Sequence, residues 1–169
     1  IAIARDVARS SDGKFIVAGE SADVAQPFFG LQRYLPNGQL DASFGAKGLL
    51  KTDFSGTLGS TRVAVQSDGR IVAVGSARLS DGKYRIAIAR YNSDGSLDKT
   101  FSGDGKLITN FGSIGEGAGG MKIQSDGKIL LAGGVDNKVA LFRLNSDGTP
   151  DAGFGNNGVA LGLADKVPP

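Results

Sequence analysis

Two short motifs recur three times along this chain of 169 residues, and their spacing constrains the fold more than any other feature. The first motif reads SSDGKFIVAG, QSDGRIVAVG and QSDGKILLAG, and its turn aspartates are separated by 56 and 58 residues (Asp12, Asp68 and Asp126). The second motif reads RYLPNGQLD, RYNSDGSLD and RLNSDGTPD, and it begins at Arg33, Arg90 and Arg143. Self-similarity at a fixed period of this length is typical of solenoids, propellers and repeat arrays.

Each repeat predicts four β-strands. Asp-Gly and Asn-Gly pairs between apolar runs are the strongest short-range signal for a hairpin, because glycine accepts the positive φ that the turn requires. Each repeat has two such turns, flanked by short β-branched or alternating runs such as FIVAG, IVAVG and YRIAIARY. We therefore predict an all-β fold of three four-stranded antiparallel repeats, the blades of a β-propeller, over residues 1–56, 57–113 and 114–169.

The amino-acid composition excludes several classes of catalytic and binding site. The chain has no cysteine and no histidine, which excludes disulfides, Ser-His-Asp or Cys-His catalysis, and zinc sites built from those residues. Its net charge is +2 without any block of like charge, so we predict no nucleic-acid partner. No apolar run approaches the roughly 18 residues of a membrane helix, so no membrane insertion is predicted. The first residue is not methionine, and we expect a segment of a longer protein.

Closure of the ring is the next constraint, because a propeller typically needs about four to eight blades. Three blades leave an apolar sheet face uncovered at each end, and such a patch favours association. The partners that we predict are either further propeller repeats of a longer chain or identical subunits. Identical subunits would be arranged as a six-bladed dimer, a larger ring or a filament.

The paired motifs, QSDGKILLAGG followed by LFRLNSDGTPDAGFGNNG, resemble the bacterial delta-60 repeat. The resemblance covers nearly the whole chain. It implies a β-propeller of unknown function within a large protein, mostly secreted or on the cell surface, and it carries no catalytic motif. Residues 1–5 fit it poorly, because IAIAR is identical to residues 86–90, a predicted third strand, yet runs directly into a first strand.

In every repeat an arginine precedes an aspartate by eight residues, across the second turn. One interpretation is a triple ligand site. The other is a structural bridge that ties the third strand to the loop beyond it, with a phenylalanine filling the core. Identical placement in every unit favours the bridge, because packing between like neighbours requires it. The pairs are Arg33 and Asp41, Arg90 and Asp98, and Arg143 and Asp151, with Phe44, Phe101 and Phe154 as the phenylalanines.

Two other motifs suggest a ligand but fit poorly. Residues 92–98, NSDGSLD, resemble part of an EF-hand loop, but Arg90 then takes the first ligand position and Phe101 the twelfth. We therefore predict no metal and no cofactor. Residues 112–120, GSIGEGAGG, suggest a phosphate-binding loop, but no Gly-Lys-Ser/Thr ending and no helix follow. We expect a flexible connection between blades there.

Binding residues are predicted on the connections that differ between repeats. In an antiparallel blade the repeated first and second turns lie on one rim of the ring, and the variable connections lie on the opposite rim. Variable loops on a regular scaffold commonly carry binding sites, and solvated loops without a ligand are the alternative. The candidates are Glu20, Asp23, Gln26, Arg78, Asp81, Lys83, Asp136, Asn137 and Lys138.

The sequence favours a non-enzymatic module. We predict an extracellular or cell-surface bacterial protein that acts in adhesion, ligand binding or self-assembly, with a glycan or a surface protein as a further partner. Two alternatives stay open. One is a lectin-like glycan-binding module, and the other is a carbohydrate-active enzyme in which Glu20 and Glu116, both on the variable rim, act as acid and base.

Overall fold

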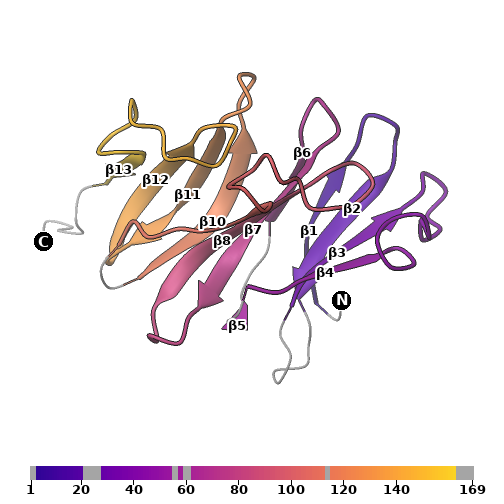
Figure 1. The fold of residues 1–169 in the computed structure, drawn as a ribbon, viewed down its shortest axis with the longest axis horizontal. Coiled ribbons are helices and arrows are strands. Elements are labelled where there is room, and N and C mark those ends of the chain that lie inside the picture. The colour runs from indigo at the N-terminus through magenta and orange to yellow at the C-terminus, as the bar shows by residue number, and fades with distance from the viewer. Residues whose placement is uncertain (1–2, 21–27, 55–56, 59–61, 113–114, 163–169) are drawn as a thin grey trace, which may run out of the picture.

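The computed structural model describes residues 3–20, 28–54, 57–58, 62–112 and 115–162. These residues form thirteen β-strands in three separate antiparallel sheets, and none of them forms a helix long and apolar enough to cross a membrane. Figure 1 shows the sheets side by side in chain order, with β1 to β4 on the right and β10 to β13 on the left. The prediction of an all-β fold of four-stranded propeller blades is confirmed, and the three sheets do not close into a ring.

The first sheet has the order β1-β2-β3-β4, so each strand pairs with the next one along the chain. The IAIAR segment, from Ile3 onward, belongs to the first strand of this sheet, because it pairs with the end of the second strand. The four strands are β1 (Ile3–Arg9), β2 (Phe15–Glu20), β3 (Phe29–Tyr34) and β4 (Leu49–Thr52).

The second sheet has the same order, but its first strand is divided into two pieces. Both pieces pair with the second strand of that sheet, Thr57 opposite Arg78 and Arg62 opposite Val74, so together they take the place of one strand. The strands of this sheet are β5 (Thr57–Leu58), β6 (Arg62–Val65), β7 (Ile71–Arg78), β8 (Tyr84–Tyr91) and β9 (Lys106–Ile108).

The third sheet corrects one prediction. Residues 112–120 were expected to form a flexible connection, but residues 116–120 belong to the first strand of this sheet. The register shifts there, and a Cβ at Gly133 would lie 1.9 Å from the carbonyl oxygen of Gly117, so close backbone approach requires glycine. The strands are β10 (Glu116–Ile123), β11 (Ile129–Val135), β12 (Lys138–Leu144) and β13 (Val159–Leu161).

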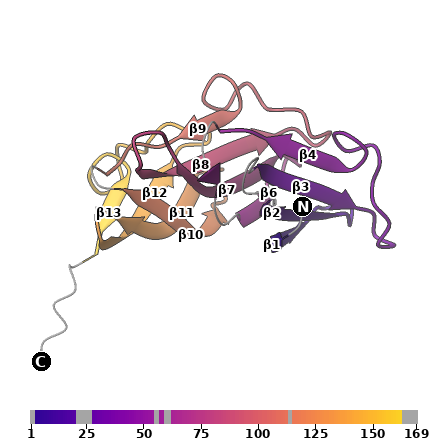
Figure 2. The same cartoon turned by 90° about the horizontal axis from the view of Figure 1, so that it is seen from below.

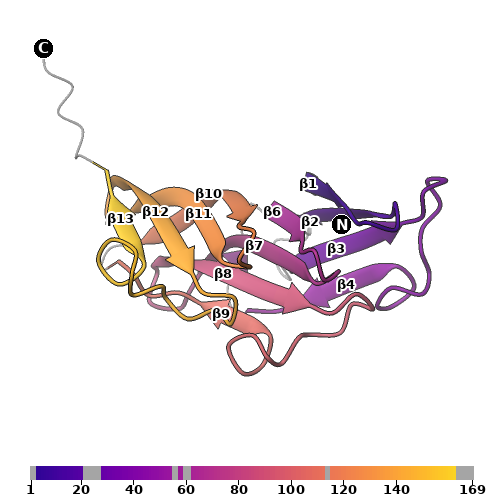
Figure 3. The ribbon, with the colours of Figure 1, turned by 90° about the horizontal axis from the view of Figure 1, so that it is seen from above.

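Two hydrophobic cores join the three sheets. One core lies between the first and second sheets, and the other lies between the second and third sheets. β7 belongs to both cores, so it is buried on both faces from Ile71 to Gly75, whereas β2 and β11 contain partly exposed residues between the buried ones. Figures 2 and 3 show β1, β6 and β10 along one side of the stack, β4 and β9 along the other, and β13 at the end formed by the third sheet.

The turns lie on two opposite rims of the stack. We call one the repeated-turn rim, because it carries the first turns, at the upper edge in Figure 1. The turn between β7 and β8 lies at the lower edge, on the rim that we call the variable rim. The first turns span residues 10–14, 66–70 and 124–128. The connection at the second turn of each repeat starts with a tight turn, at residues 35–39, 92–96 and 145–149.

Each sheet has an Arg face, which is the face that carries its motif arginine. The Arg faces of the first and second sheets are covered by the following sheet, because their apolar residues belong to the two cores. On the Arg face of the third sheet, Val139 is 68% exposed and Leu141 is 41% exposed. At the other end of the stack, on the first sheet's opposite face, Val7 is 58% exposed. Among the described residues, both ends of the stack therefore present apolar side chains to solvent.

Candidate functional site

Each repeat builds one Arg–Asp–Phe group at its second turn. The arginine, on the third strand of its sheet, donates from Nε to Oδ2 of the aspartate eight residues later, at 2.7–2.8 Å. Its guanidinium Cζ lies 4.3–4.9 Å from the centroid of the phenylalanine ring, within the range of a cation–π contact. The groups are Arg33–Asp41–Phe44, Arg90–Asp98–Phe101 and Arg143–Asp151–Phe154.

A second cation reaches the same aspartate from the first turn of each repeat. The side-chain nitrogens of Lys14, Arg70 and Lys128 lie 3.5, 3.0 and 3.0 Å from Oδ2 of that aspartate, in the same order. The aspartate therefore ties together the first turn, the third strand and the second turn of its repeat. Sequence reasoning missed this contact. The signal was the basic residue that follows Asp-Gly in every first turn.

Hydrogen bonds keep these aspartates ionised. The hydroxyl and the N–H of Ser43 both donate to Oδ1 of Asp41, and these bonds are the main reason that the pKa of Asp41 is lowered to about 2. Burial raises the pKa of Asp98, but the hydrogen bonds from Thr100 and the charge of Arg90 outweigh burial, so that its pKa is lowered. The repeated carboxylates are therefore stable anions, without the raised pKa of a general acid.

We expect the stability of the fold to decrease as the pH falls from about 4 to about 2. An unfolded aspartate titrates at about 3.9, whereas Asp41 titrates at about 2 in the fold, and so does Asp151, chiefly because Lys128 donates a hydrogen bond to it. In this window the folded chain binds fewer protons than the unfolded chain, so protonation favours unfolding. Circular dichroism melts over this range measure the effect. Joint replacement Asp41→Asn and Asp151→Asn should flatten the dependence, and a melting temperature independent of pH in the unmodified chain would contradict it.

The Arg–Asp–Phe group also contacts the following repeat. Nη1 of Arg33 donates to the carbonyl oxygen of Ser93, and Nη1 of Arg90 donates to that of Ser146. The glycine two residues after each serine packs on the phenylalanine: a Cβ at Gly95 would lie 3.0 Å from the Phe44 ring. We call the Arg–Asp–Phe group the socket. The second-turn residues that it receives are the docking turn, Ser93–Gly95 in the first junction and Ser146–Gly148 in the second.

The socket of the third repeat and the docking turn of the first repeat are more open than their counterparts. The Arg143 side chain is 24% exposed, compared with 9% for Arg33 and 5% for Arg90. Phe154 is partly exposed, whereas the other two socket phenylalanines are fully buried. The equivalent of the docking turn in the first repeat is Pro36–Gly38, whose glycine is exposed. The chain thus leaves one socket and one docking turn unused among its described residues.

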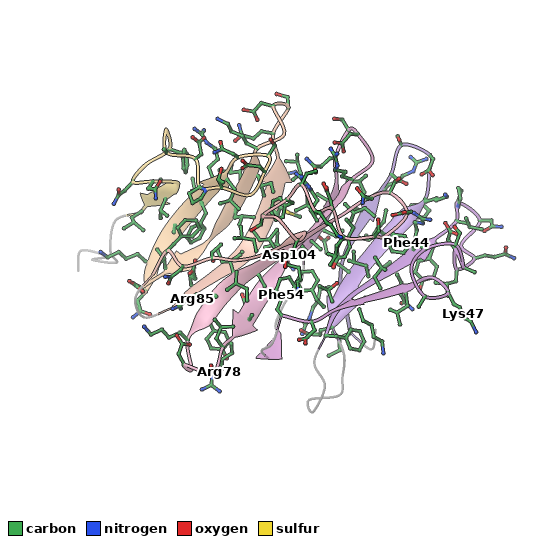
Figure 4. The ribbon with its side chains drawn as sticks, viewed as in Figure 1. Phe44, Lys47, Phe54, Arg78, Arg85 and Asp104 are labelled. Atoms are coloured by element: carbon green, nitrogen blue, oxygen red, sulfur yellow. The ribbon has the colours of Figure 1, made fainter. Side chains whose placement is uncertain are left out.

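The variable-rim candidates of the second repeat share a single turn. Nε of Arg78 donates to the carbonyl oxygen of Gly82 at 3.3 Å, and the N–H of Lys83 donates to Oδ1 of Asp81 at 2.9 Å. Figure 4 shows Arg78 at the lower edge of the molecule, beside this turn. These contacts close the turn on itself. Of the first repeat's candidates, Asp23 and Gln26 lie outside the described residues.

The third repeat's candidates form a two-residue hairpin turn. Asp136 and Asn137 both have positive φ, 48° and 62°, and the following Lys138 pairs with Val135 across the turn. Asp136 and Lys138 line an open cavity of about 410 Å³, and Asn156 also lines it. In this cavity, predicted binding residues of the third repeat share a hollow with the polar side chains of Asn110, Asn156 and Asn157.

The two glutamates proposed as an acid and base both have contacts within the fold. Arg5 donates to the Glu20 carboxylate. The Glu116 side chain is fully buried and accepts hydrogen bonds from Oγ1 of Thr109 at 2.7 Å and from the N–H of Phe111 at 2.9 Å. Burial raises the pKa of Glu116, and these hydrogen bonds oppose the shift. Glu116 thus ties β10 to the connection that precedes it.

The turn carboxylates considered for calcium are used by the turns themselves. Oδ1 of Asp94 accepts from both the N–H and the hydroxyl of Ser96, at 2.8 and 2.7 Å, and Asp147 accepts in the same way from Thr149. Within the described ranges, no group of three or more Asp, Glu, His or Cys side chains is arranged to hold a metal ion.

A protein-family model described as a domain of unknown function (DUF5122) β-propeller matches residues 10–44, 66–101 and 124–154 of the chain. The three segments together cover more than half of the sequence. Each segment begins at the first turn of a repeat and ends at the socket phenylalanine, so each contains both sequence motifs. No match was found among curated proteins.

Proposed function

Because this chain belongs to the DUF5122 β-propeller family, we propose that it is a non-enzymatic assembly and binding module whose end sheets join further propeller blades. The observation that carries this proposal is the Arg face of the third sheet, which is apolar and open to solvent. The same face in the first two repeats is the surface through which one sheet packs on the next.

Equivalent positions in the three repeats support this assignment. In the first two repeats, the residues two and four positions before the motif arginine are buried. They are Leu31 and Phe29 in the first repeat, and Ile88 and Ile86 in the second. The third repeat has Leu141 and Val139, which are exposed. An end face that functioned in water would carry polar side chains at these positions. The apolar residues therefore favour a face that another blade covers.

The charged groups support a scaffold rather than an enzyme. All three socket aspartates hold a motif arginine and a second cation, and Glu116 is buried with hydrogen bonds to both of its oxygens. These contacts stabilise packing between strands and repeats. We also propose, from the sequence motifs, that the chain belongs to the delta-60 repeats of bacterial extracellular or cell-surface proteins. There it acts in adhesion or ligand binding, with the variable rim, including the Asp136–Lys138 cavity, facing a glycan or a surface protein.

An apolar fluorescent dye tests the end face directly. In dilute solution, where chains are separate, we expect the dye to bind the unmodified protein and the double variant Val139→Asp and Leu141→Asp to lose about half of that binding, because the exposed apolar face of the first sheet is unchanged. The matched control is Tyr84→Asp, because Tyr84 is 53% exposed but lies at the variable rim, outside the end face. Dye binding that is the same in all three proteins would contradict the proposal.

A further inference from the structure

We propose that the open socket of the third repeat binds the Pro36–Gly38 docking turn of a second copy of this chain, and that two such junctions close a six-bladed dimer. This inference rests on the assembly function proposed above, and it names both the partner and the contact. The chain shows the contact twice, between its own repeats.

The two internal junctions define the geometry that the partner must reproduce. In each one, the socket arginine donates to the carbonyl oxygen of the first residue of the docking turn. The turn glycine then lies against the socket phenylalanine, so closely that a Cβ at Gly148 would be 2.8 Å from the Phe101 ring. The contact uses a backbone carbonyl and a glycine, so it depends on the conformation of the turn more than on its other side chains.

The Pro36–Gly38 turn has the conformation that this contact requires. The N–H of Gly38 donates to the carbonyl oxygen three residues earlier at 2.9 Å, and the same bond is 2.9 Å at Gly95 and 3.0 Å at Gly148. The φ angles of the three glycines are 82°, 95° and 92°. Proline replaces serine at the first position of the turn, but it keeps the carbonyl oxygen that the arginine needs.

The environment of Gly38 shows that this turn is free. Gly95 and Gly148 are buried, whereas Gly38 is exposed, and a Cβ at Gly38 would have no atom within 4 Å. At the other end of the chain, Arg143 and Phe154 are the most exposed of the socket residues. The one exposed docking turn and the one open socket of the described structure are therefore complementary halves of a single junction.

The sheet faces beside these two elements are complementary as well. In the internal junctions the opposite face of one sheet packs on the Arg face of the preceding sheet. The opposite face of the second sheet does so with Ile71, Ala73 and Tyr91. The corresponding residues of the first sheet are Phe15, Val17 and Tyr34, and all three are partly exposed. A second copy that docks its turn would thus bring an apolar sheet face onto Val139 and Leu141.

A closed dimer follows from the number of blades. Each copy has one open socket and one exposed docking turn among its described residues, so the contact is head to tail and repeats until it closes. Propellers have about four to eight blades. Two copies of the three blades that the structure describes give six, whereas three copies give nine, so two copies of these 169 residues form the ring.

Complementation between two variants tests the inference. The socket variant is Val139→Asp with Leu141→Asp, and the docking-turn variant is Gly38→Val, whose side chain would meet Phe154 of the other copy. Light scattering behind a sizing column should show that each variant alone associates at least tenfold more weakly than the unmodified dimer. An equal mixture should regain a species of twice the chain mass, because one junction in the mixed dimer joins two intact halves. Gly103→Val is the control, since Gly103 has a φ of 88° and no atom within 4 Å of a Cβ, but lies outside the docking turn.

The possible outcomes separate this inference from the proposed function. An unmodified dimer, two monomeric variants and a restored mixture support the inference. Variants that stay monomeric when mixed, or an unmodified chain that is a monomer or an open polymer, overturn it. A monomer that still loses dye binding in the socket variant would leave the end face as a contact surface for further repeats, and would remove only the second copy as its partner.

Discussion

Replacement of Arg90 by methionine is expected to destabilise the fold by about 3 kcal/mol, because removing one partner of a buried ion pair leaves the other charge uncompensated. The Arg90 side chain is 5% exposed and binds Asp98, Thr100 and the carbonyl oxygen of Ser146 in the next repeat. Arg70 stays 3.0 Å from the Asp98 carboxylate, which places the loss at the low end of the usual range of about 3–5 kcal/mol. The melting temperature should fall by roughly 10 °C in a chain of this size.

Arg143→Met is the matched control for this experiment. Arg143 makes the same bond to its aspartate, but its side chain is 24% exposed, and within the described residues no second turn of a following repeat lies in its socket. In the monomer its replacement should cost about 1 kcal/mol or less, as for other solvent-exposed ion pairs. Chemical denaturation of the two variants in dilute solution measures the difference. Equal losses would show that the contact between repeats adds nothing to the arginine–aspartate bond.

Replacement of Gly95 by valine should destabilise the fold by about 2–5 kcal/mol, the sum of two effects. A side chain at positive φ costs about 1–2 kcal/mol, and the φ of Gly95 is 95°. Its Cβ would also lie 3.0 Å from the Phe44 ring and 3.1 Å from Leu50, and overpacking of this kind costs about 1–3 kcal/mol. Thermal unfolding followed by circular dichroism measures the total.

Gly103→Val separates the two effects, because Gly103 has a φ of 88° and its Cβ would have no neighbour within 4 Å. It should lose only the backbone contribution, about 1–2 kcal/mol. If the Gly95 and Gly103 variants melt at the same temperature, the docking turn does not pack tightly in the socket of the first repeat.

Local signals predicted the sheets. Asp-Gly and Asn-Gly turns with positive-φ glycines fix where hairpins form, and these signals lie within a few residues of each other, so the four strands of each repeat could be read from the sequence. The strands to which residues 112–120 and IAIAR belong could not be predicted, because they depend on which other strand each segment pairs with. Glycines usually weaken a strand, but Gly133 of β11, which has no Cβ, allows the backbone of β10 to come close at Gly117. IAIAR has the sequence of a third strand, and its partner, β2, makes it part of a first strand.

The candidate site was predicted in part, for the same physical reason. The eight-residue spacing between Arg33 and Asp41 spans one turn, so the pair could be proposed from sequence. The contact from Arg33 to Ser93 crosses sixty residues and depends on how one sheet packs on the next, and no local pattern reports it. The last socket has the same three residue types as its counterparts, and the first docking turn keeps the glycine of the others, so the sequence does not show that these two elements are open. Their exposure in the structure shows it.

The molar mass of the unmodified chain in solution tests the central claim most directly. Light scattering behind a sizing column, over a range of concentrations, should show one species of twice the chain mass that dissociates to monomer on dilution. A second copy would then cover the open Arg face of the third sheet. A monomer at every concentration would contradict the account, because the exposed socket and the exposed docking turn would then have no affinity for each other.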